Sequence, residues 1–335
     1  MSNSVLLKVN DLKKTFVKKT GPFLKRKITN VYAVNNVSFK IHKGETLGII
    51  GESGCGKTTT ARMVMRLMQE TSGEIWFDGR NLCTLKEAET NRIRSKMQMI
   101  FQDPYDTLNP GMRTLDILME PINAHEKALP YSKKLEIVKE AIESIGLVPA
   151  DDYMYRYPHQ LSGGQRQRIA IARAIILKPS FIAADEPTSM LDVSVRAGIL
   201  NLLLEFKKKM GLTMMFITHD LTTASYMCDR IAVMYQGRIV EIGPTKKIIQ
   251  RPSHPYTKSL VSVVKDLNNF IENREKLILD GEVDATKNNV GCPFVSRCPH
   301  QESVCHTKYP ELELVDSGHS VSCHCHSELL EKHHK

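Results

Sequence analysis

Residues 51–60 hold the arrangement of residue types in this chain that is most specific for one kind of chemistry, GESGCGKTTT. The apolar run Leu47–Ile50 precedes them and predicts a buried strand, whereas Lys57 and the residues after it predict a helix. Glycines between a strand and a helix let successive backbone N–H groups face a phosphate, and the helix adds its positive end. Lysine and threonine at the end of such a loop hold phosphate oxygens and Mg²⁺. We therefore predict a nucleoside triphosphate site, formed by Gly51, Ser53, Gly54, Cys55, Gly56, Lys57, Thr58 and Thr59.

Two carboxylates end a second apolar run, FIAADE, at residues 181–186. Asp185 is expected to hold Mg²⁺ through water, and Glu186 to polarise the water that attacks a phosphate. Many strands end in acidic residues, so this pattern gains its meaning from its position downstream of a phosphate loop.

A second anion-binding helix start is predicted at residues 161–165, LSGGQ. The alternative is an ordinary helix cap with Ser162 at the capping position. An ordinary cap does not explain why one chain carries two phosphate-binding features and a single Asp-Glu pair.

The elements expected around these motifs alternate between strands and helices, which favours an α/β fold with a largely parallel sheet. A helical insert is expected over residues 103–178, with Pro121 and Pro130 dividing its helical pattern. A further helix is expected at 197–209. The expected strands are 5–12, 31–41, 74–78, 97–101, 181–186, 212–218 and 231–235. The basic stretch between the first two strands is interpreted as a solvated loop, with contact to a membrane surface as the alternative.

The composition, 41% hydrophobic and 25% charged, is that of a globular protein. No apolar run is long enough to cross a bilayer, and the first residues do not resemble a signal peptide, so we expect a cytoplasmic protein. The net charge of +9 favours anionic partners without selecting among nucleotide, nucleic acid and membrane.

These motifs together resemble the ATP-binding subunits of ABC transporters, over residues 1 to about 245. LSGGQ is similar to the signature motif of that family, and Gln102, Asp192 and His219 lie in segments similar to its Q-loop, D-loop and switch histidine. The resemblance implies an ABC ATPase core, with a RecA-like sheet and an antiparallel β part, over 1–102 and 179–249. It also implies a helical signature subdomain over 103–178, and a small cysteine-rich domain over 250–335.

The resemblance also implies an enzyme in which two such subunits sandwich two MgATP. Glu186, His219 and Gln102 would be catalytic, and Thr58, Gln102 and Asp185 would hold Mg²⁺. Phe16 is expected to stack on adenine, with a core phenylalanine as the alternative. Ser162, Gly163, Gly164 and Gln165 would bind the ATP of the partner subunit.

The resemblance is narrowed to the dipeptide/oligopeptide branch of the family by three segments, IFQDPYDTLNP, RPSHPYTKSL and the cysteine-bearing end. This branch also includes nickel importers. This branch implies a second ATPase subunit, two membrane permease subunits, an extracytoplasmic peptide-binding protein and a place at the cytoplasmic face of the membrane. The alternatives are import of nickel or another solute, and an ABC-type ATPase that acts on nucleic acid. The single cassette argues against the last, so no nucleic acid is expected.

The cysteines near the end of the chain indicate a metal rather than disulfides in a cytoplasmic protein. CxxC pairs typical of zinc knuckles are absent, but nearby histidines leave zinc open. Some members of the branch hold a [4Fe–4S] cluster here, which implies that role for Cys292, Cys298, Cys305 and Cys323, with Cys325 as a competitor. Two other interpretations are kept. The segment could hold no metal, or it could be an interaction module that is stabilised by a metal and regulates docking.

Cys55 lies inside the phosphate loop and is most simply a residue that the loop tolerates. A thiol at a helix start can nonetheless have a lowered pKa. We therefore also state the hypothesis that oxidants inhibit the protein through Cys55.

Overall fold

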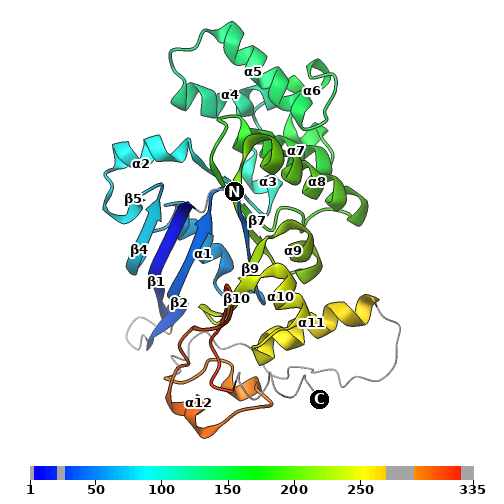
Figure 1. Cartoon of the computed structure of the whole chain (residues 1–335). Coiled ribbons are helices and arrows are strands. Elements are labelled where there is room, and N and C mark those ends of the chain that lie inside the picture. Colours follow the sequence, from blue (N-terminus) through cyan, green and yellow to red (C-terminus); the bar gives the residue numbers. More distant parts are fainter. Residues whose placement is uncertain (1–3, 21–26, 269–289, 326–335) are drawn as a thin grey trace. The chain divides into compact units, whose positions relative to one another are not determined.

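The computed structural model describes residues 4–20, 27–268 and 290–325 of the chain, and they form two compact units (Figure 1). Of the described residues, the first unit contains 4, 42–45 and 84–216. The second contains 5–20, 27–41, 46–83, 217–268 and 290–325.

A small antiparallel sheet of the second unit has the strand order β2-β1-β4-β5. Its strands are β1 (Val5–Thr20), β2 (Lys27–His42), β4 (Ser72–Phe77) and β5 (Arg80–Asn81). The first two strands are longer than predicted, so the basic residues up to Thr20 continue β1 instead of forming a loop. The strand continues because its groups find partners: the Thr15 amide donates to Thr71 Oγ1 at 3.0 Å and Lys14 Nζ to the Gln69 carbonyl at 2.6 Å. The middle of the basic stretch lies outside the described residues.

The second sheet of this unit has the order β11-β12-β10-β9-β3. The strands are β3 (Thr46–Ile50), β9 (Arg230–Tyr235), β10 (Arg238–Pro244), β11 (Glu313–Asp316) and β12 (His319–Val321). Strands β3 and β9 are parallel, and the other pairs are antiparallel. All five residues of β3 are buried, which agrees with its continuous apolar sequence. The helices are α1 (Lys57–Val64), α9 (Leu221–Met227), α10 (Thr245–Gln250), α11 (Pro255–Asn268) and α12 (Ser303–Thr307).

The segment that carries β11 and β12 is part of this second unit, because these strands extend the sheet that contains β3. Val321 and Ser320 of β12 pair with Glu241 and Ile242 of β10. The expectation of a separate cysteine-rich domain is therefore not confirmed.

The first unit combines three strands, in the order β8-β7-β6, with a group of helices. The strands are β6 (Met97–Ile100), β7 (Phe181–Asp185) and β8 (Thr213–Thr218), whose last two residues belong to the second unit. The helices are α2 (Glu87–Arg94), α3 (Pro104–Thr107), α4 (Thr114–His125), α5 (Tyr131–Ser144), α6 (Asp151–Met154), α7 (Gly163–Ile175) and α8 (Val193–Met210).

Of the two prolines that were expected to divide the helical pattern, Pro130 does so and Pro121 does not. Pro130 is the residue before the first turn of α5, where a proline without an N–H costs nothing. Pro121 lies inside α4, which continues through it. Leu118 and Ile122 on either side are buried, so packing outweighs the lost hydrogen bond. Within the described residues, no helix combines the length and apolarity needed to span a bilayer.

Candidate functional site

The phosphate loop lies in the second unit, between β3 and α1. Gly51, Gly54 and Gly56 have φ angles of 155°, 78° and 104°, which residues with a side chain rarely adopt. A Cβ at Gly51 would lie 2.2 Å from the Met234 carbonyl oxygen, and a Cβ at Gly56 would lie 2.2 Å from the Ala33 carbonyl oxygen. Glycine is therefore required at both positions, and the loop packs its backbone directly on neighbouring backbone.

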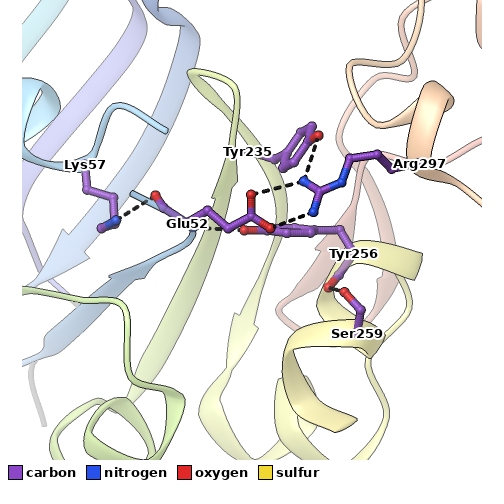
Figure 2. Close-up of polar contacts among 6 residues, drawn as sticks. All are labelled: Glu52, Lys57, Tyr235, Tyr256, Ser259 and Arg297. Carbon is purple, nitrogen blue, oxygen red and sulfur yellow. Dashed lines mark hydrogen bonds and ion pairs between the residues drawn. The ribbon is translucent and has the colours of Figure 1, made fainter. Parts of the chain in front are cut away.

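Lys57 begins α1, and its side chain is held within the loop. Its Nζ donates to the carbonyl oxygens of Gly51 at 2.8 Å and Glu52 at 2.9 Å, and the second contact is visible in Figure 2. The residue is only 6% exposed. An ammonium group has three donors, so the lysine can rearrange to contact phosphate oxygens. Around it, Ser53 and Gly54 are exposed, whereas Thr58 and Thr59 are half-buried.

Cys55 is buried in the loop, at 1% exposure. Burial raises the pKa of its thiol above the ordinary value, and this effect outweighs the nearby Lys57 ammonium, which lowers it. The prediction of a lowered pKa at this helix start is therefore wrong, because removal from water dominates. The hypothesis of oxidant inhibition through Cys55 loses its chemical basis.

His219 and Phe16 are the other predicted site residues of the second unit. His219 is exposed and follows β8 directly. The next residue, Asp220, caps α9 by accepting hydrogen bonds from the amides of Thr222 at 2.9 Å and Thr223 at 3.1 Å, which fixes the turn that carries the histidine. Phe16 is 39% exposed, so the alternative of a core phenylalanine is wrong.

In the first unit, Gln102 and Glu186 approach each other, with 3.4 Å between Gln102 Nε2 and Glu186 Oε2. The register of the parallel strands explains this approach. Ile100 of β6 lies opposite Ala184 of β7, and each functional residue follows two positions later. The ends of adjacent parallel strands therefore bring the amide and the carboxylate together.

Asp185 and Glu186 differ in their surroundings although they are neighbours. Asp185 ends β7 and is 3% exposed, whereas Glu186 is half-buried. Glu186 also has a φ of 45°, in the left-handed region that glutamate avoids. Such strain persists where the surroundings impose it, and it is common at functional positions.

The signature segment, residues 161–165, starts helix α7 in the first unit. Ser162 is the cap, and the pairing is reciprocal: the Gln165 amide donates to Ser162 Oγ at 3.3 Å, and the Ser162 amide donates to Gln165 Oε1 at 2.9 Å. Ser162 is exposed, so the start of α7 faces outward. A Cβ at Gly164 would lie 2.6 Å from Cγ1 of Val195, so this glycine also permits close packing against α8. Gly163 lies beside it, and Asp192 is exposed and precedes α8.

The cysteine segment does not form the predicted metal site. Among the described residues, no group of three or more His, Cys, Asp or Glu is arranged to hold a metal ion. Burial raises the pKa of Cys292 to about 12 and that of Cys323 to about 11, and raises that of Cys298. The Cys292 amide donates to the Cys305 carbonyl at 2.8 Å. The [4Fe–4S] cluster and its zinc alternative are therefore not supported by this arrangement.

Cys325, which is expected to compete with Cys323, has hydrogen-bond partners other than the four predicted cysteine ligands. Its Sγ lies 3.2 Å from Glu302 Oε1 and 3.3 Å from the His300 carbonyl oxygen. Burial is the main cause that raises the pKa of this thiol, and the Glu302 contact adds to it. The Cys325 thiol is thus a hydrogen-bond donor within its own segment.

Two residues that contact the phosphate loop, Tyr256 and Arg297, were not predicted. Tyr256 lies in the segment RPSHPYTKSL, which the sequence marks only as typical of one transporter branch. Arg297 lies between Cys292 and Cys298, which the sequence indicates as metal ligands and not as partners of the phosphate loop. No local pattern links either residue to a loop some 200 residues earlier, so only the fold shows these contacts.

Comparison with known families gives two matches. Residues 34–189 match the family described as "ABC transporter", and residues 240–305 match "Oligopeptide/dipeptide transporter, C-terminal region". The first match contains the phosphate loop, Gln102, the signature segment and Glu186, and the second contains α11 and Arg297.

Related proteins and structures agree with these matches. The chain is 41% identical over 329 residues to "Oligopeptide transport ATP-binding protein AppF" of Bacillus subtilis, covering 97% of this chain and 99% of the relative. It is 46% identical over 296 residues to "Putative oligopeptide transport ATP-binding protein YkfD" of the same species, covering 88% and 89%. A dimeric ATP-binding cassette, MJ0796, solved in a post-hydrolysis state bound to ADP and Pi, is 30% identical with a TM-score of 0.63, covering 72% of this chain and 99% of that chain. The chain therefore belongs to the ABC transporter family, among the ATP-binding proteins that carry the oligopeptide/dipeptide transporter C-terminal region.

Proposed function

We propose that this chain hydrolyses ATP to power the import of dipeptides or oligopeptides through a membrane ABC transporter. The observation that carries the proposal is the joint match: an ABC transporter region that contains the phosphate loop and signature is followed by a peptide-transporter C-terminal region. Relatives similar over nearly the whole chain are named for oligopeptide transport.

The proposal assigns each site residue a role. Amides of the loop, the Lys57 ammonium and Thr59 hold the phosphates, and the exposed Phe16 ring stacks on adenine. Thr58, Gln102 and Asp185 supply the hydroxyl, amide and carboxylate oxygens that Mg²⁺ prefers, and the ion would neutralise phosphate charge.

Glu186 is the proposed general base, because its carboxylate is only half-buried and lies within reach of Gln102. Gln102 orients that carboxylate, and His219 contacts the γ-phosphate. Electrostatic stabilisation and positioning carry most of the catalysis in phosphoryl transfer.

A second subunit completes the proposed site. Ser162, Gly163, Gly164 and Gln165 begin α7, where the Ser162 and Gln165 amides already pair with each other's side chains, so the Gly163 and Gly164 amides and the Ser162 hydroxyl suit the ATP of a partner. Asp192 is assigned to the same contact. The partner is a second copy or a homologous ATPase, and MJ0796, similar over most of its length, was solved as a dimer.

The remaining partners follow from the same proposal. Two permease subunits span the membrane, and an extracytoplasmic protein delivers the peptide, so this chain acts at the cytoplasmic face.

We retain the division into a core (1–102 and 179–249), a signature subdomain (103–178) and a C-terminal region (250–335) as a functional division. The finer part of the proposal is that Cys292, Cys298, Cys305 and Cys323 would hold a [4Fe–4S] cluster, which would require an arrangement of these cysteines that the described residues do not show. Iron and zinc analysis of the anaerobically purified protein tests it, and absence of iron contradicts it, with or without zinc.

Replacement of the proposed base tests the enzymatic role. In the assembled transporter, Glu186→Gln is expected to bind MgATP but to lose at least about 100-fold in turnover, the range for removal of a general base. Glu205→Gln on α8 is the matched control, since Glu205 is exposed and pairs with Lys209 at the surface. Normal turnover in Glu186→Gln contradicts the assignment.

Uptake by cells tests the solute. Cells that depend on this chain are expected to accumulate labelled dipeptides or oligopeptides, and to stop doing so with Glu186→Gln. Accumulation of ⁶³Ni²⁺ without peptide uptake shows instead that the solute is nickel.

A further inference from the structure

Arg297, near the end of the chain, contacts the phosphate loop near its beginning. Its Nη1 lies 3.0 Å from Glu52 Oε2 and its Nη2 lies 3.2 Å from Glu52 Oε1, so the guanidinium forms a bidentate ion pair with the carboxylate (Figure 2). Nη1 also donates to Tyr235 Oη at 3.3 Å. The Arg297 side chain is 8% exposed and that of Glu52 is 30% exposed. Paired charges that are shielded from water attract each other more strongly than exposed pairs. The two parallel contacts of the guanidinium also fix the orientation of the Glu52 carboxylate.

A second contact holds the backbone of the same loop residue. The Glu52 amide donates to Tyr256 Oη at 2.9 Å, and Tyr256 is fully buried at the start of α11 (Figure 2). Its ring lies 4.7 Å from that of Tyr235 and 5.6 Å from that of Phe294, three residues before Arg297. Aromatic packing therefore connects Tyr256 to the segment that carries Arg297, so the two residues that contact Glu52 support each other.

Glu52 is thus held at its side chain and at its amide by the region that matches the peptide-transporter C-terminus, while it belongs to the ABC transporter region itself. Its third polar group, the carbonyl, accepts from Lys57 Nζ at 2.9 Å. The position of Glu52 consequently influences where the lysine and the loop amides point.

We propose that Arg297 and Tyr256 are positioning residues for ATP binding: the C-terminal segment holds Glu52 and keeps the phosphate loop in its binding shape. A loop already ordered loses less conformational entropy when the triphosphate binds. Arg297 also balances the Glu52 carboxylate, which would otherwise repel the nearby triphosphate. This inference rests on the proposed function only in that the loop binds ATP.

Nucleotide titration of purified variants tests the inference, with a fluorescent trinitrophenyl-ATP as the probe. Arg297→Gln is expected to raise the Kd about tenfold, and Arg297→Lys to give an intermediate Kd because it keeps the charge but loses the fork. Tyr256→Phe removes only the hydroxyl and is expected to raise the Kd several-fold. In steady-state assays of the assembled transporter, the KM for ATP rises while turnover at saturating ATP stays within about twofold.

Arg238→Gln is the matched control. The Arg238 guanidinium lies 3.9 Å from the centre of the Tyr309 ring, so this variant also removes an arginine side chain that contacts the C-terminal segment, at a ring that takes no part in the contacts to Glu52 described above. Its Kd is expected to equal that of the wild type. An equal rise in both variants means general loosening of the segment and overturns the inference.

A double-mutant cycle separates positioning from a general structural role. If Arg297 acts through Glu52, then Glu52→Gln combined with Arg297→Gln raises the Kd less than the product of the two single effects, because no bare carboxylate remains. Multiplicative effects, or a wild-type Kd in Arg297→Gln, overturn the inference. Failure of the wild type to bind the probe contradicts the proposed function instead, so the two failures are distinguishable.

Discussion

At the scale of single residues, burial decides the chemistry of groups whose sequence neighbours suggest otherwise. Cys55 lies between two glycines and two positions before Lys57 at a helix start, a setting that lowers a thiol pKa. Its side chain is nevertheless almost without solvent contact, and the pKa rises. The reactive thiolate is therefore scarce, and reagents cannot reach it.

Alkylation is expected to spare Cys55. Brief treatment of the folded protein with iodoacetamide at pH 7.5, followed by peptide mass spectrometry, should leave Cys55 unmodified, because its thiol is buried and protonated. The same treatment in urea should modify it, which is the control for detection. Fast modification of Cys55 in the folded protein, with loss of activity prevented by Cys55→Ser, would show that the buried state is wrong.

His254 illustrates the same effect with a base. The residue is 1% exposed, and its amide donates to Glu241 Oε2 at 2.9 Å. Burial lowers the pKa of His254 to about 4, although the Glu241 charge opposes the shift. Between that value and about 6.5, the unfolded chain binds a proton that the folded chain does not.

The free energy of unfolding is therefore expected to fall as the pH drops from about 6.5 towards 4. His254 contributes about 2 kcal/mol of this loss between pH 7 and pH 5, from the difference between the two pKa values. Urea unfolding of the wild type and of His254→Gln at both pH values measures it, and the variant should show a smaller pH effect. His306→Gln, which changes an exposed histidine, is the control. An unchanged pH effect in His254→Gln would argue against a neutral buried ring.

At the scale of elements, the strand ends and turns place the site. Parallel pairing of β6 and β7 brings Gln102 to Glu186, and the register follows from apolar runs that the sequence shows clearly. Strand β10 is not among the predicted strands, because Gln236-Gly237 precedes it and Gly243-Pro244 ends it, and both pairs are typical of turns. It forms because β9 and β12 pair with its two edges, and β12 lies far away in the sequence.

The loop glycines are expected to differ in what an added methyl group costs. Gly56→Ala places a Cβ against the Ala33 carbonyl at a φ of 104°, whereas Gly54→Ala has a φ of 78° and no neighbouring atom within 4 Å. Gly54→Ala should therefore lose about 1 kcal/mol of stability through backbone strain alone. Gly56→Ala should lose about 3 kcal/mol or more, because strain and a backbone clash add.

Urea unfolding of the two variants at pH 7 tests this pair, and each serves as the reference for the other. Equal losses of stability would mean that the β3–α1 loop moves away from the residue 33 backbone at little cost.

At the scale of the whole molecule, the site depends on a second subunit if the signature serves a partner's ATP. Ser162 is exposed and already caps its own helix, which leaves the other amides at the start of α7 for a ligand from outside. The same helix start therefore has a local and an intermolecular role.

ATPase activity per molecule is accordingly expected to rise with protein concentration, because association completes each site. Measurement of turnover over a hundredfold dilution series, with sedimentation to follow the oligomer, checks this expectation. Addition of a homologous ATPase subunit is the control for a mixed pair. Full activity in an isolated monomer would contradict the shared site.

The sequence by itself determined the parts of this protein that depend on local patterns. The phosphate loop, the Asp-Glu strand end and the signature turn are each contiguous, so residue type and spacing reveal them, and with them the family and the α/β fold. Their chemistry requires backbone geometry that only a few residue types permit, which makes such segments recognisable.

Only the tertiary structure decided what depends on burial and on contacts between distant segments. It buried Cys55 and raised its pKa, exposed Phe16, extended β1 through the basic residues and left the cysteines without a metal-holding arrangement. It also brought Arg297 to Glu52 across 245 positions. A pairing of this kind follows from how β3, β9 and α11 pack, and packing is a property of all the segments together.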